Sequence, residues 1–354
     1  MNLIFFCQSV LESDPVIADT ISRIKEFSKN EKVIHVDVIC LRGEKKVLTE
    51  KISVYPIQPT NRSRIVTLFR LVRTLIALCR NKKVDAVYLY MTPTVAPFFF
   101  LLKPFFGYKV VTWFGHSIYT PVTKISLLYF TDLWLNANKS MAPFIPSHLR
   151  LIGQGTDPLV FYPQDIRPEY DLITVGRITK AKKLELIIDA LKYCKITYNK
   201  SYTLFICGDP YVKADIEYKQ GLIKYIEDQG VMSQVVFAGA IPRESLRVKL
   251  NSARAFVFTS PGGVGKSSVE ALACGIPLII TSPEASDFFG ADLASSFLCA
   301  PNPAALGSKI HECLNRSAIE AANLKNSSLR LFKESYSLES FVGRAVDEIE
   351  LKIK

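Results

Sequence analysis

Residues 260–277 read SPGGVGKSSVEALACGIP, and this stretch decides the fold of the second half of the chain. It follows an apolar run, RAFVFT at residues 254–259, which is typical of a buried strand. Three glycines remove side chains from the turn, and residues 267–274 then have the composition of a helix. A second apolar run, PLIIT at residues 277–281, follows this helix. A strand, a turn, a helix and a strand in this order predict a parallel α/β unit.

The alternation of strands and helices continues along the whole chain. Further strands are expected at residues 2–7, 33–41, 52–57, 84–91, 109–114, 171–175, 202–207 and 234–238. Helices are expected between them, notably at residues 16–28, 64–80, 184–194 and 219–229. Apolar strands separated by helices indicate parallel sheets that are covered on both faces.

A polar stretch, YPQDIRPEY at residues 162–170, interrupts this pattern and is the expected linker between two domains. The sequence therefore predicts an α/β chain of two Rossmann-like doubly wound domains, residues 1–163 and 164–336, that face a central cleft. The amphipathic residues 337–354 are expected to form a helix that packs back toward the N-terminal domain. Ligands of such sheets bind at the carboxyl ends of the strands and in the cleft.

Composition narrows the class of protein. Hydrophobic residues make up 49% of the 354, and the net charge of +11 indicates an anionic partner, either a phosphorylated small molecule or an anionic lipid. No nucleic-acid-binding module is found, so a nucleic-acid partner is not expected. The eight cysteines and four histidines are dispersed, which favours reduced thiols and no metal site. The N-terminus lacks the basic region of a signal peptide, and Lys103 and Pro104 interrupt the longest apolar stretch, so we expect a cytoplasmic protein without a membrane span.

Two strand ends in the second half carry residues suited to a nucleotide diphosphate. The first is Gly176-Arg177-Ile-Thr-Lys-Ala-Lys182, where two cations lie near a helix N-terminus. The second is the glycine turn, whose backbone amides can cradle phosphate, with Glu270 in the following helix to accept hydrogen bonds from ribose hydroxyls. A solvated basic loop and a packing turn with a surface glutamate are the alternatives.

The glycine turn has a competing interpretation as the phosphate loop of an ATPase. Ser260 to Ser267 matches G-x-x-x-x-G-K-[ST] except at the first position, which is Ser260 rather than glycine. The strand that follows ends in TSPE, however, without the aspartate that would hold magnesium. We therefore keep the ATPase only as a less favoured alternative.

Two features of the first half have open roles. His116, followed by Ser117, comes just after the expected strand 109–114, where it is either catalytic or structural. The helix 64–80 places its apolar side chains on one arc and its arginines on another. The apolar arc, Ile65, Leu68, Val72, Leu75, Ile76 and Cys79, is expected to cover the sheet. The basic residues between Arg62 and Lys83 offer a peripheral contact with an anionic membrane surface.

These motifs resemble glycosyltransferase family four, the retaining glycosyl transferase group 1 enzymes with the GT-B fold. The resemblance is strongest between residues 172 and 314 and traceable before them. Its G-R-x-x-x-x-K motif matches Gly176, Arg177 and Lys182. Its E-G-F-G-x4-E-A-x-A-x-G-x-P signature matches from Gly263 to Pro277. The remaining matches are Gly208, Asp209 and the run Val235 to Gly239.

The resemblance implies a role for each matched residue. The N-terminal domain would bind the acceptor and the C-terminal domain the nucleotide-sugar donor. Arg177 and Lys182 would bind the donor diphosphate, and Phe237 and Gly239 would line the base. Glu270 would bind the ribose, and His116 would lie beside the transferred sugar. The amides of Gly263, Val264, Gly265, Lys266 and Ser267 would lie near the sugar and phosphates, together with Gly262.

The chain departs from the family pattern at several positions. The first glutamate of the family's E-x7-E pair, which faces the donor sugar, is Gly262 here. This change leaves room for a larger, deoxy or acidic sugar, or indicates an inactive member. The glycine that usually follows the motif lysine is Lys183, the segment at Gly208 lacks its second glycine, and residues 8–15 lack the family's Gly-Gly turn.

The resemblance implies retaining transfer of a sugar from a nucleotide-diphosphate sugar to a glycan or lipid-linked acceptor, in polysaccharide or glycolipid biosynthesis. Neither a metal nor another cofactor is expected, because Arg177, Lys182 and helix amides would stabilise the leaving diphosphate. The protein would be cytoplasmic or peripheral on the inner face of the plasma membrane. An inactive homologue that acts as a partner subunit is the alternative.

Overall fold

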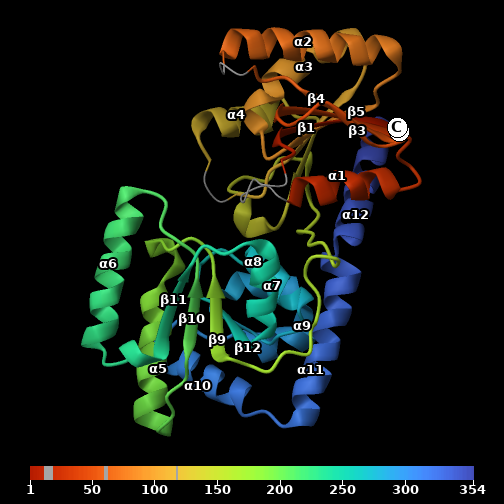
Figure 1. Cartoon of the computed structure of the whole chain (residues 1–354). Helices are drawn as coiled ribbons and strands as arrows, with labels where there is room; N and C mark the ends of the chain where they lie inside the picture. The colour runs from red at the N-terminus through yellow and green to blue at the C-terminus, as the bar shows by residue number, and fades with distance from the viewer. Residues whose placement is uncertain (12–18, 60–62, 117–118) are drawn as a thin grey trace. The chain divides into compact units, whose positions relative to one another are not determined.

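The computed structural model of the chain describes residues 1–11, 19–59, 63–116 and 119–354, without the side chains of residues 291 and 292. Arg62, Ser117, the start of the expected helix 16–28 and the end of the stretch 8–15 lie outside the described residues. The chain divides into two compact units (Figure 1). The first unit comprises Met1–Asp157 and Leu338–Lys354, and the second comprises Pro158–Ser337.

The first unit is built on an eight-stranded sheet with the order β3-β4-β2-β1-β5-β6-β7-β8. Its strands are β1 (Asn2–Ser9), β2 (His35–Arg42), β3 (Lys46–Thr49), β4 (Ile52–Pro56), β5 (Ala86–Tyr90), β6 (Lys109–Trp113), β7 (Leu133–Asn136) and β8 (Leu149–Leu151). Neighbouring strands pair in parallel except β3 and β4, which are antiparallel. The predicted parallel sheet of the first half is therefore present, with one antiparallel edge strand.

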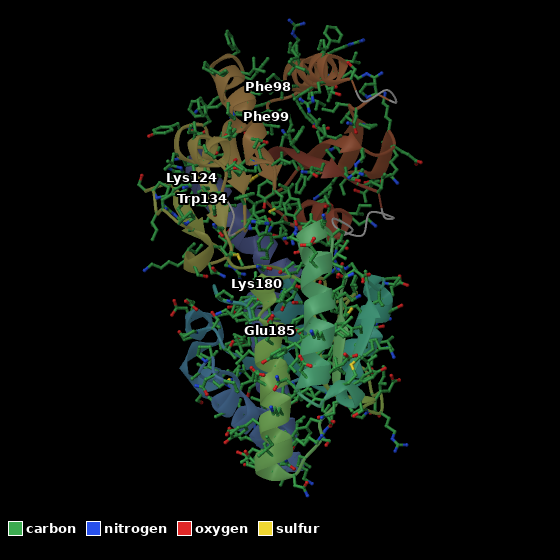
Figure 2. All side chains as sticks on the ribbon, turned by 90° about the vertical axis from the view of Figure 1, so that its left-hand side faces the viewer. Phe98, Phe99, Lys124, Trp134, Lys180 and Glu185 are labelled. Atoms are coloured by element: carbon green, nitrogen blue, oxygen red, sulfur yellow. The ribbon has the colours of Figure 1, made fainter. Side chains whose placement is uncertain are left out.

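Helices cover both faces of this sheet. Alternate residues of β1 point to opposite faces: Leu3 and Phe5 pack with α1 (Asp19–Lys29) and α12 (Leu338–Ile353), whereas Ile4 and Phe6 pack with α2 (Arg64–Asn81) and α3 (Ala96–Phe106). Phe99 of α3 is fully buried on the second of these faces (Figure 2). The shorter α4 (Pro121–Tyr129) precedes β7. Because α12 comes from the end of the chain, this unit is assembled from two separate segments.

The orientation of α2 differs from the sequence prediction. The side chains that α2 buries are Leu71, Leu75 and Leu78, whereas Ile65 is 82% exposed and Leu68 is 51% exposed. The expected apolar arc was therefore wrong at Ile65 and Leu68, whereas Leu75 is buried and Val72, Ile76 and Cys79 are half-buried. Apolar residues occur on every side of this helix, so its periodicity did not determine which side packs on the sheet.

The second unit has a five-stranded sheet with the order β11-β10-β9-β12-β13, and every neighbouring pair is parallel. Its strands are β9 (Tyr170–Val175), β10 (Leu204–Cys207), β11 (Val235–Gly239), β12 (Ala253–Phe258) and β13 (Leu278–Ile280). One face packs on α5 (Leu184–Tyr198), α6 (Lys213–Asp228) and α10 (Pro303–Leu314). The other packs on α7 (Arg243–Asn251), α8 (Lys266–Ala273), α9 (Ser286–Phe297) and α11 (Ala318–Leu331).

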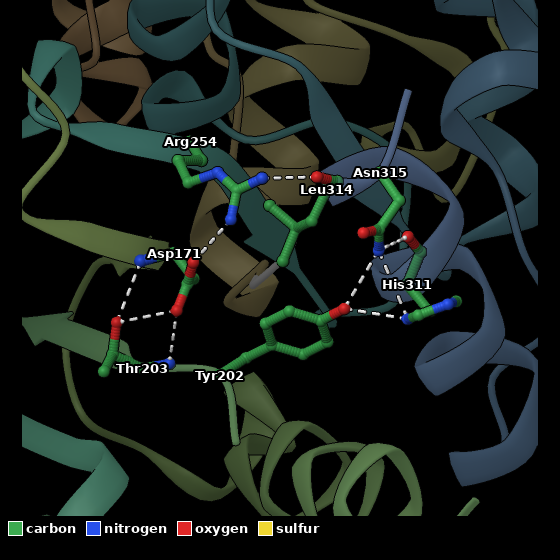
Figure 3. A network of polar contacts seen from close by, with 7 residues as sticks. All are labelled: Asp171, Tyr202, Thr203, Arg254, His311, Leu314 and Asn315. Carbon is green, nitrogen blue, oxygen red and sulfur yellow. Dashed lines mark hydrogen bonds and ion pairs between the residues drawn. The ribbon is translucent and has the colours of Figure 1, made fainter. Parts of the chain in front are cut away.

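A polar network holds the amino-terminal edge of this second sheet (Figure 3). Arg254 of β12 pairs with Asp171 of β9, with 2.8 Å between Nη1 and Oδ1, and also donates to the carbonyl of Leu314. The other carboxylate oxygen of Asp171 accepts from the amide of Thr203 at 2.9 Å. The network therefore joins β9, β10, β12 and the end of α10 at the edge opposite the glycine turn.

Three general expectations can be compared with the structure. All eight cysteines are free thiols. Within the residues that the structure describes, none of the helices combines the length and the apolar character needed to span a bilayer. In the same part of the chain, no group of three or more histidine, cysteine, aspartate or glutamate side chains is placed to hold a metal ion.

Candidate functional site

The carboxyl ends of β9 to β13 lie at one edge of the second sheet, here called the carboxyl edge. Gly176, Gly208 and Gly239 lie at the ends of three adjacent strands, and the amide of Gly208 donates to the carbonyl of Gly239 at 2.8 Å. A Cβ atom added to Gly208 would lie 2.0 Å from the carbonyl oxygen of Gly176. Only glycine fits at Gly208, so the backbone of these two strand ends forms a tightly packed floor.

Two cations stand above this floor. A Cβ atom on Gly176 would lie 2.8 Å from Nζ of Lys182, so the ammonium group lies directly over this glycine. The same Nζ is 4.8 Å from the centre of the Phe258 ring. Burial, and then the charge of Arg177, lower the pKa of Lys182 to about 8. Arg177 itself is exposed, with its guanidinium 5.3 Å from the centre of the Tyr211 ring. The two cations interact with each other, and an anion bound between them would offset the repulsion of their like charges.

Lys183 occupies the position at which the family pattern has glycine. Its φ of 48° lies in the left-handed region, where a residue with a side chain is disfavoured by about 1–2 kcal/mol. Oγ1 of Thr259, at the end of β12, donates to the carbonyls of Lys182 at 2.6 Å and Lys183 at 3.3 Å. This contact holds the loop after β9 against the end of β12 in spite of the backbone strain.

The glycine turn after β12 contains two consecutive left-handed residues. Gly262 has a φ of 88° and Gly263 a φ of 91°, which explains why both are glycine. Val264 is buried and fixes the turn in the core. The amide of Gly263 donates to Oγ of Ser282, which follows β13, at 2.9 Å. The predicted phosphate-binding amide of Gly263 is thus bonded to a side chain in this structure.

Helix α8 begins directly after the turn. Gly265 is its N-cap residue, and a Cβ atom there would lie 3.1 Å from the Phe258 ring. Lys266 is the first residue of α8 and is half-buried. Oγ of Ser267 donates to the carbonyl of Val175 at 3.1 Å. In an ATPase, this hydroxyl would bind magnesium, so its bond to a strand carbonyl argues against that alternative.

Glu270 lies on the first turns of α8, buried at 6% exposure. Its Oε1 atom is 3.4 Å from Nη2 of Arg243, the first residue of α7. The guanidinium of Arg243 also stacks 5.1 Å from the centre of the buried Phe161 ring. The carboxylate of Glu270 is therefore placed beside a guanidinium at this strand end, where its oxygens can accept hydrogen bonds.

The loop after β10 contacts the loop after β11. Oδ2 of Asp209 accepts from the amide of Ala240 at 2.7 Å, and a Cβ atom on Gly239 would lie 3.3 Å from the same oxygen. Nζ of Lys219 lies 3.7 Å from the other carboxylate oxygen and 5.5 Å from the centre of the half-buried Phe237 ring. Asp209 therefore holds the two loops together.

Residues 164–329 match the family model for glycosyl transferases group 1. This segment of the chain is therefore similar to the glycosyl transferases group 1. The matched segment contains every candidate residue named above between Gly176 and Glu270. No curated protein matches the chain by sequence.

Solved structures confirm the predicted GT-B fold. A sucrose-phosphate synthase from Thermosynechococcus elongatus is 16% identical with a TM-score of 0.74, over 99% of this chain and 98% of the other. HepE from Anabaena, solved in complex with UDP, is 17% identical with a TM-score of 0.72, over 99% and 100%. A glycosyltransferase from Rickettsia africae is 14% identical with a TM-score of 0.75, over 100% and 98%.

The remaining predicted residue, His116, belongs to the first unit. It follows β6 on the carboxyl side of that sheet and is exposed, and its ring stacks with Phe114 at 6.1 Å between centroids. The second unit thus brings all the other predicted residues to one edge, while His116 is presented by a separate sheet.

Sequence reasoning missed several residues of this edge. They are Lys219, Arg243, Thr259, Ser282 and Glu284. Arg243 carried a usable signal, because it opens a helix directly after a strand, as the loop of Arg177 does. Ser282 and Glu284 carried none, because the bond from Gly263 to Ser282, through which Glu284 is linked to the turn, depends on β13 lying next to β12.

Proposed function

We propose that this chain is a retaining glycosyltransferase that moves a sugar from a nucleotide-diphosphate sugar to a glycan or lipid-linked acceptor, in polysaccharide or glycolipid biosynthesis. One observation carries the proposal. At the carboxyl edge, the two cations Arg177 and Lys182 lie at the end of β9, and the carboxylate of Glu270, beside Arg243, lies beyond the end of the neighbouring β12. Cations for a diphosphate and a carboxylate for ribose hydroxyls are the two groups that a nucleoside diphosphate requires.

The roles of the residues follow from their chemistry. Arg177 and Lys182 bind the diphosphate, Glu270 accepts from the ribose, and Phe237 and Gly239 border the base. When the sugar leaves, negative charge grows on the diphosphate, and the two cations stabilise that charge more than the ground state. His116 contributes from the first unit beside the transferred sugar. The transfer requires no metal in this proposal. The bond between the sugar and the diphosphate breaks, the acceptor hydroxyl attacks the same face of the sugar, and its proton passes to the departing phosphate oxygen.

The test is a thermal-shift panel of UDP, GDP, ADP and CDP with their sugar conjugates. UDP and UDP-glucose are the first probes, because the GT-B structure of HepE was solved with each of them. At least one nucleotide is expected to stabilise the protein. The variants Arg177→Ala and Glu270→Ala should remove this stabilisation, while Lys224→Ala on the exposed side of α6 should retain it. A panel in which no nucleotide stabilises the protein would refute the proposal.

An inactive homologue acting as a partner subunit is the second candidate, favoured by the glycine at Gly262 and by the bonded amide of Gly263. It predicts nucleotide binding without turnover. Release of free UDP from UDP-sugars, followed with and without a membrane extract as acceptor, separates the two candidates. Turnover that Lys182→Met abolishes excludes the inactive homologue.

We further propose that α2 docks the protein on an anionic membrane surface, on the cytoplasmic side. Ile65 and Phe69 are 82% and 66% exposed. A groove of about 390 Å³ beside them is lined by Phe69, Val72, Arg73, Ile76, Ala77 and Arg80. Apolar side chains flanked by arginines suit an interface with anionic lipid. Wild type should sediment with vesicles containing phosphatidylglycerol, and Phe69→Glu should not. Equal sedimentation of both proteins would exclude this role of α2.

A further inference from the structure

The glycine turn lacks the carboxylate that the family pattern places at its start. Position 262 is glycine with a left-handed φ of 88°. A Cβ atom added to Gly262 would meet no described atom within 4 Å. The turn therefore offers no acid at this position and leaves open space beside its backbone.

A different carboxylate, at the neighbouring strand end, is linked to the same turn through one side-chain hydroxyl. Glu284 belongs to the short 3-10 helix Pro283–Ala285, directly after β13. The amide of Gly263 donates to Oγ of the buried Ser282 at 2.9 Å, and the hydroxyl of Ser282 donates to Oε2 of Glu284. Two hydrogen bonds in series thus connect the carboxylate to the residue that follows Gly262.

The sheet fixes this arrangement. Strands β12 and β13 are hydrogen-bonded neighbours, with Phe258 opposite Ile280 in the register. The glycine turn and Ser282 therefore leave the same edge side by side, and Ser282 is held in the core while Glu284 is exposed. The bond from Ser282, and then one from its own backbone amide, lower the pKa of Glu284, so that its carboxylate is charged at neutral pH.

We propose that Glu284 supplies the donor-sugar carboxylate that Gly262 lacks, accepting a hydrogen bond from a hydroxyl of the transferred sugar. This inference rests on the proposed function, and it names the class of donor. An anion beside the sugar favours a neutral, hydroxyl-bearing sugar and disfavours an acidic one such as a uronic acid, because two negative charges at close range repel each other. The glycine at position 262 leaves room for a larger, deoxy or acidic donor sugar. A carboxylate of Glu284 beside the sugar disfavours the acidic one of these.

The test compares binding of the nucleotide alone with binding of its sugar conjugates. Dissociation constants are measured by calorimetry for UDP, GDP, ADP and CDP, for their conjugates with glucose, galactose, mannose and N-acetylglucosamine, and for UDP-glucuronic acid. Three proteins are compared: wild type, Glu284→Gln and the control Glu227→Gln on the exposed side of α6. In Glu284→Gln the side-chain carbonyl oxygen can still accept the hydrogen bond from Ser282, and thermal unfolding checks that the variant folds.

Glu284→Gln should leave the affinity for the nucleoside diphosphate within about twofold. It should weaken the best neutral sugar conjugate by about tenfold, as expected when a hydrogen bond to a charged carboxylate is replaced by one to a neutral amide oxygen. It should also strengthen UDP-glucuronic acid relative to UDP-glucose by about tenfold. A residue that only braced the turn would leave this last ratio unchanged. The control should match wild type throughout.

Two results would overturn the inference. The first is a variant whose preference between neutral and acidic conjugates equals that of wild type. The second is an equal loss of affinity for the nucleotide and for its conjugates, which would show that Glu284 supports the turn and does not contact the sugar. Failure of every nucleotide to bind wild type would instead refute the proposed function, and this inference with it, so the two failures are distinguishable.

Discussion

The lowered pKa of Lys182 makes nucleotide binding depend on pH in a defined direction. In the free protein this pKa is about 8, and a diphosphate beside the ammonium raises it by favouring the charged form. Below pH 8 the lysine already carries its proton. Above pH 8 binding must first take up a proton, so the dissociation constant rises about tenfold per pH unit. Between pH 7 and pH 9 the nucleotide should bind about tenfold more weakly, which is about 1.4 kcal/mol.

Calorimetry at pH 7, 8 and 9, in two buffers with different ionisation enthalpies, measures both the affinity and the proton uptake. Wild type should take up about one proton at pH 9. Lys182→Arg keeps its charge throughout, so its affinity should be nearly constant over this range. Lys182→Met should bind weakly and without the pH dependence. The reasoning fails if the dissociation constant of wild type changes by less than about twofold, or if Lys182→Arg shows the same rise.

Three further predictions concern stability, measured by urea denaturation. Gly208→Ala should lower the free energy of unfolding by about 3 kcal/mol or more, because the new Cβ atom would lie 2.0 Å from the carbonyl oxygen of Gly176. The control Gly107→Ala, whose Cβ atom would have nothing within 4 Å, should lower it by only about 1–2 kcal/mol. An equal cost for both would contradict the packed floor. Lys183→Gly should raise the free energy of unfolding by up to about 1 kcal/mol. The reason is that relief of the backbone strain at a φ of 48° outweighs the greater conformational entropy of glycine in the unfolded chain. A clear fall in the free energy of unfolding would show that the side chain of Lys183 stabilises the fold. Arg254→Met should lower it by about 1–3 kcal/mol and leave nucleotide affinity unchanged, because its network lies at the opposite edge; weaker nucleotide binding would show that the two edges are coupled.

The sequence predicted the class of fold because the strands are apolar throughout and alternate with helices. It located the strand ends well, since glycines mark them for a physical reason: at Gly208 no side chain fits, and at Gly263 the backbone is left-handed. It failed for α2, whose apolar residues surround the helix, so that the sheet selected Leu71, Leu75 and Leu78 by packing.

The candidate site was predictable where its residues are close in sequence to a strand end, as for Lys182 and Glu270. It was not predictable where two strand ends meet in space. The pair of Arg243 with Glu270 and the chain of bonds from Gly263 to Glu284 both depend on the strand order, which no local pattern encodes. Motifs within one loop are therefore found readily, and contacts between loops require the topology.

The position of α12 has a consequence for how the protein is made. The second unit is one continuous segment, Pro158–Ser337, so it can fold as soon as that segment has left the ribosome. The first unit needs Leu338–Lys354 as well, and buried residues of α12 such as Phe341, Val342 and Val346 complete the core that α1 shares. The first unit, most of which is synthesised first, therefore completes its core last. Until α12 has been synthesised, the apolar side chains on the α1 side of its sheet are partly uncovered and can bind chaperones or aggregate.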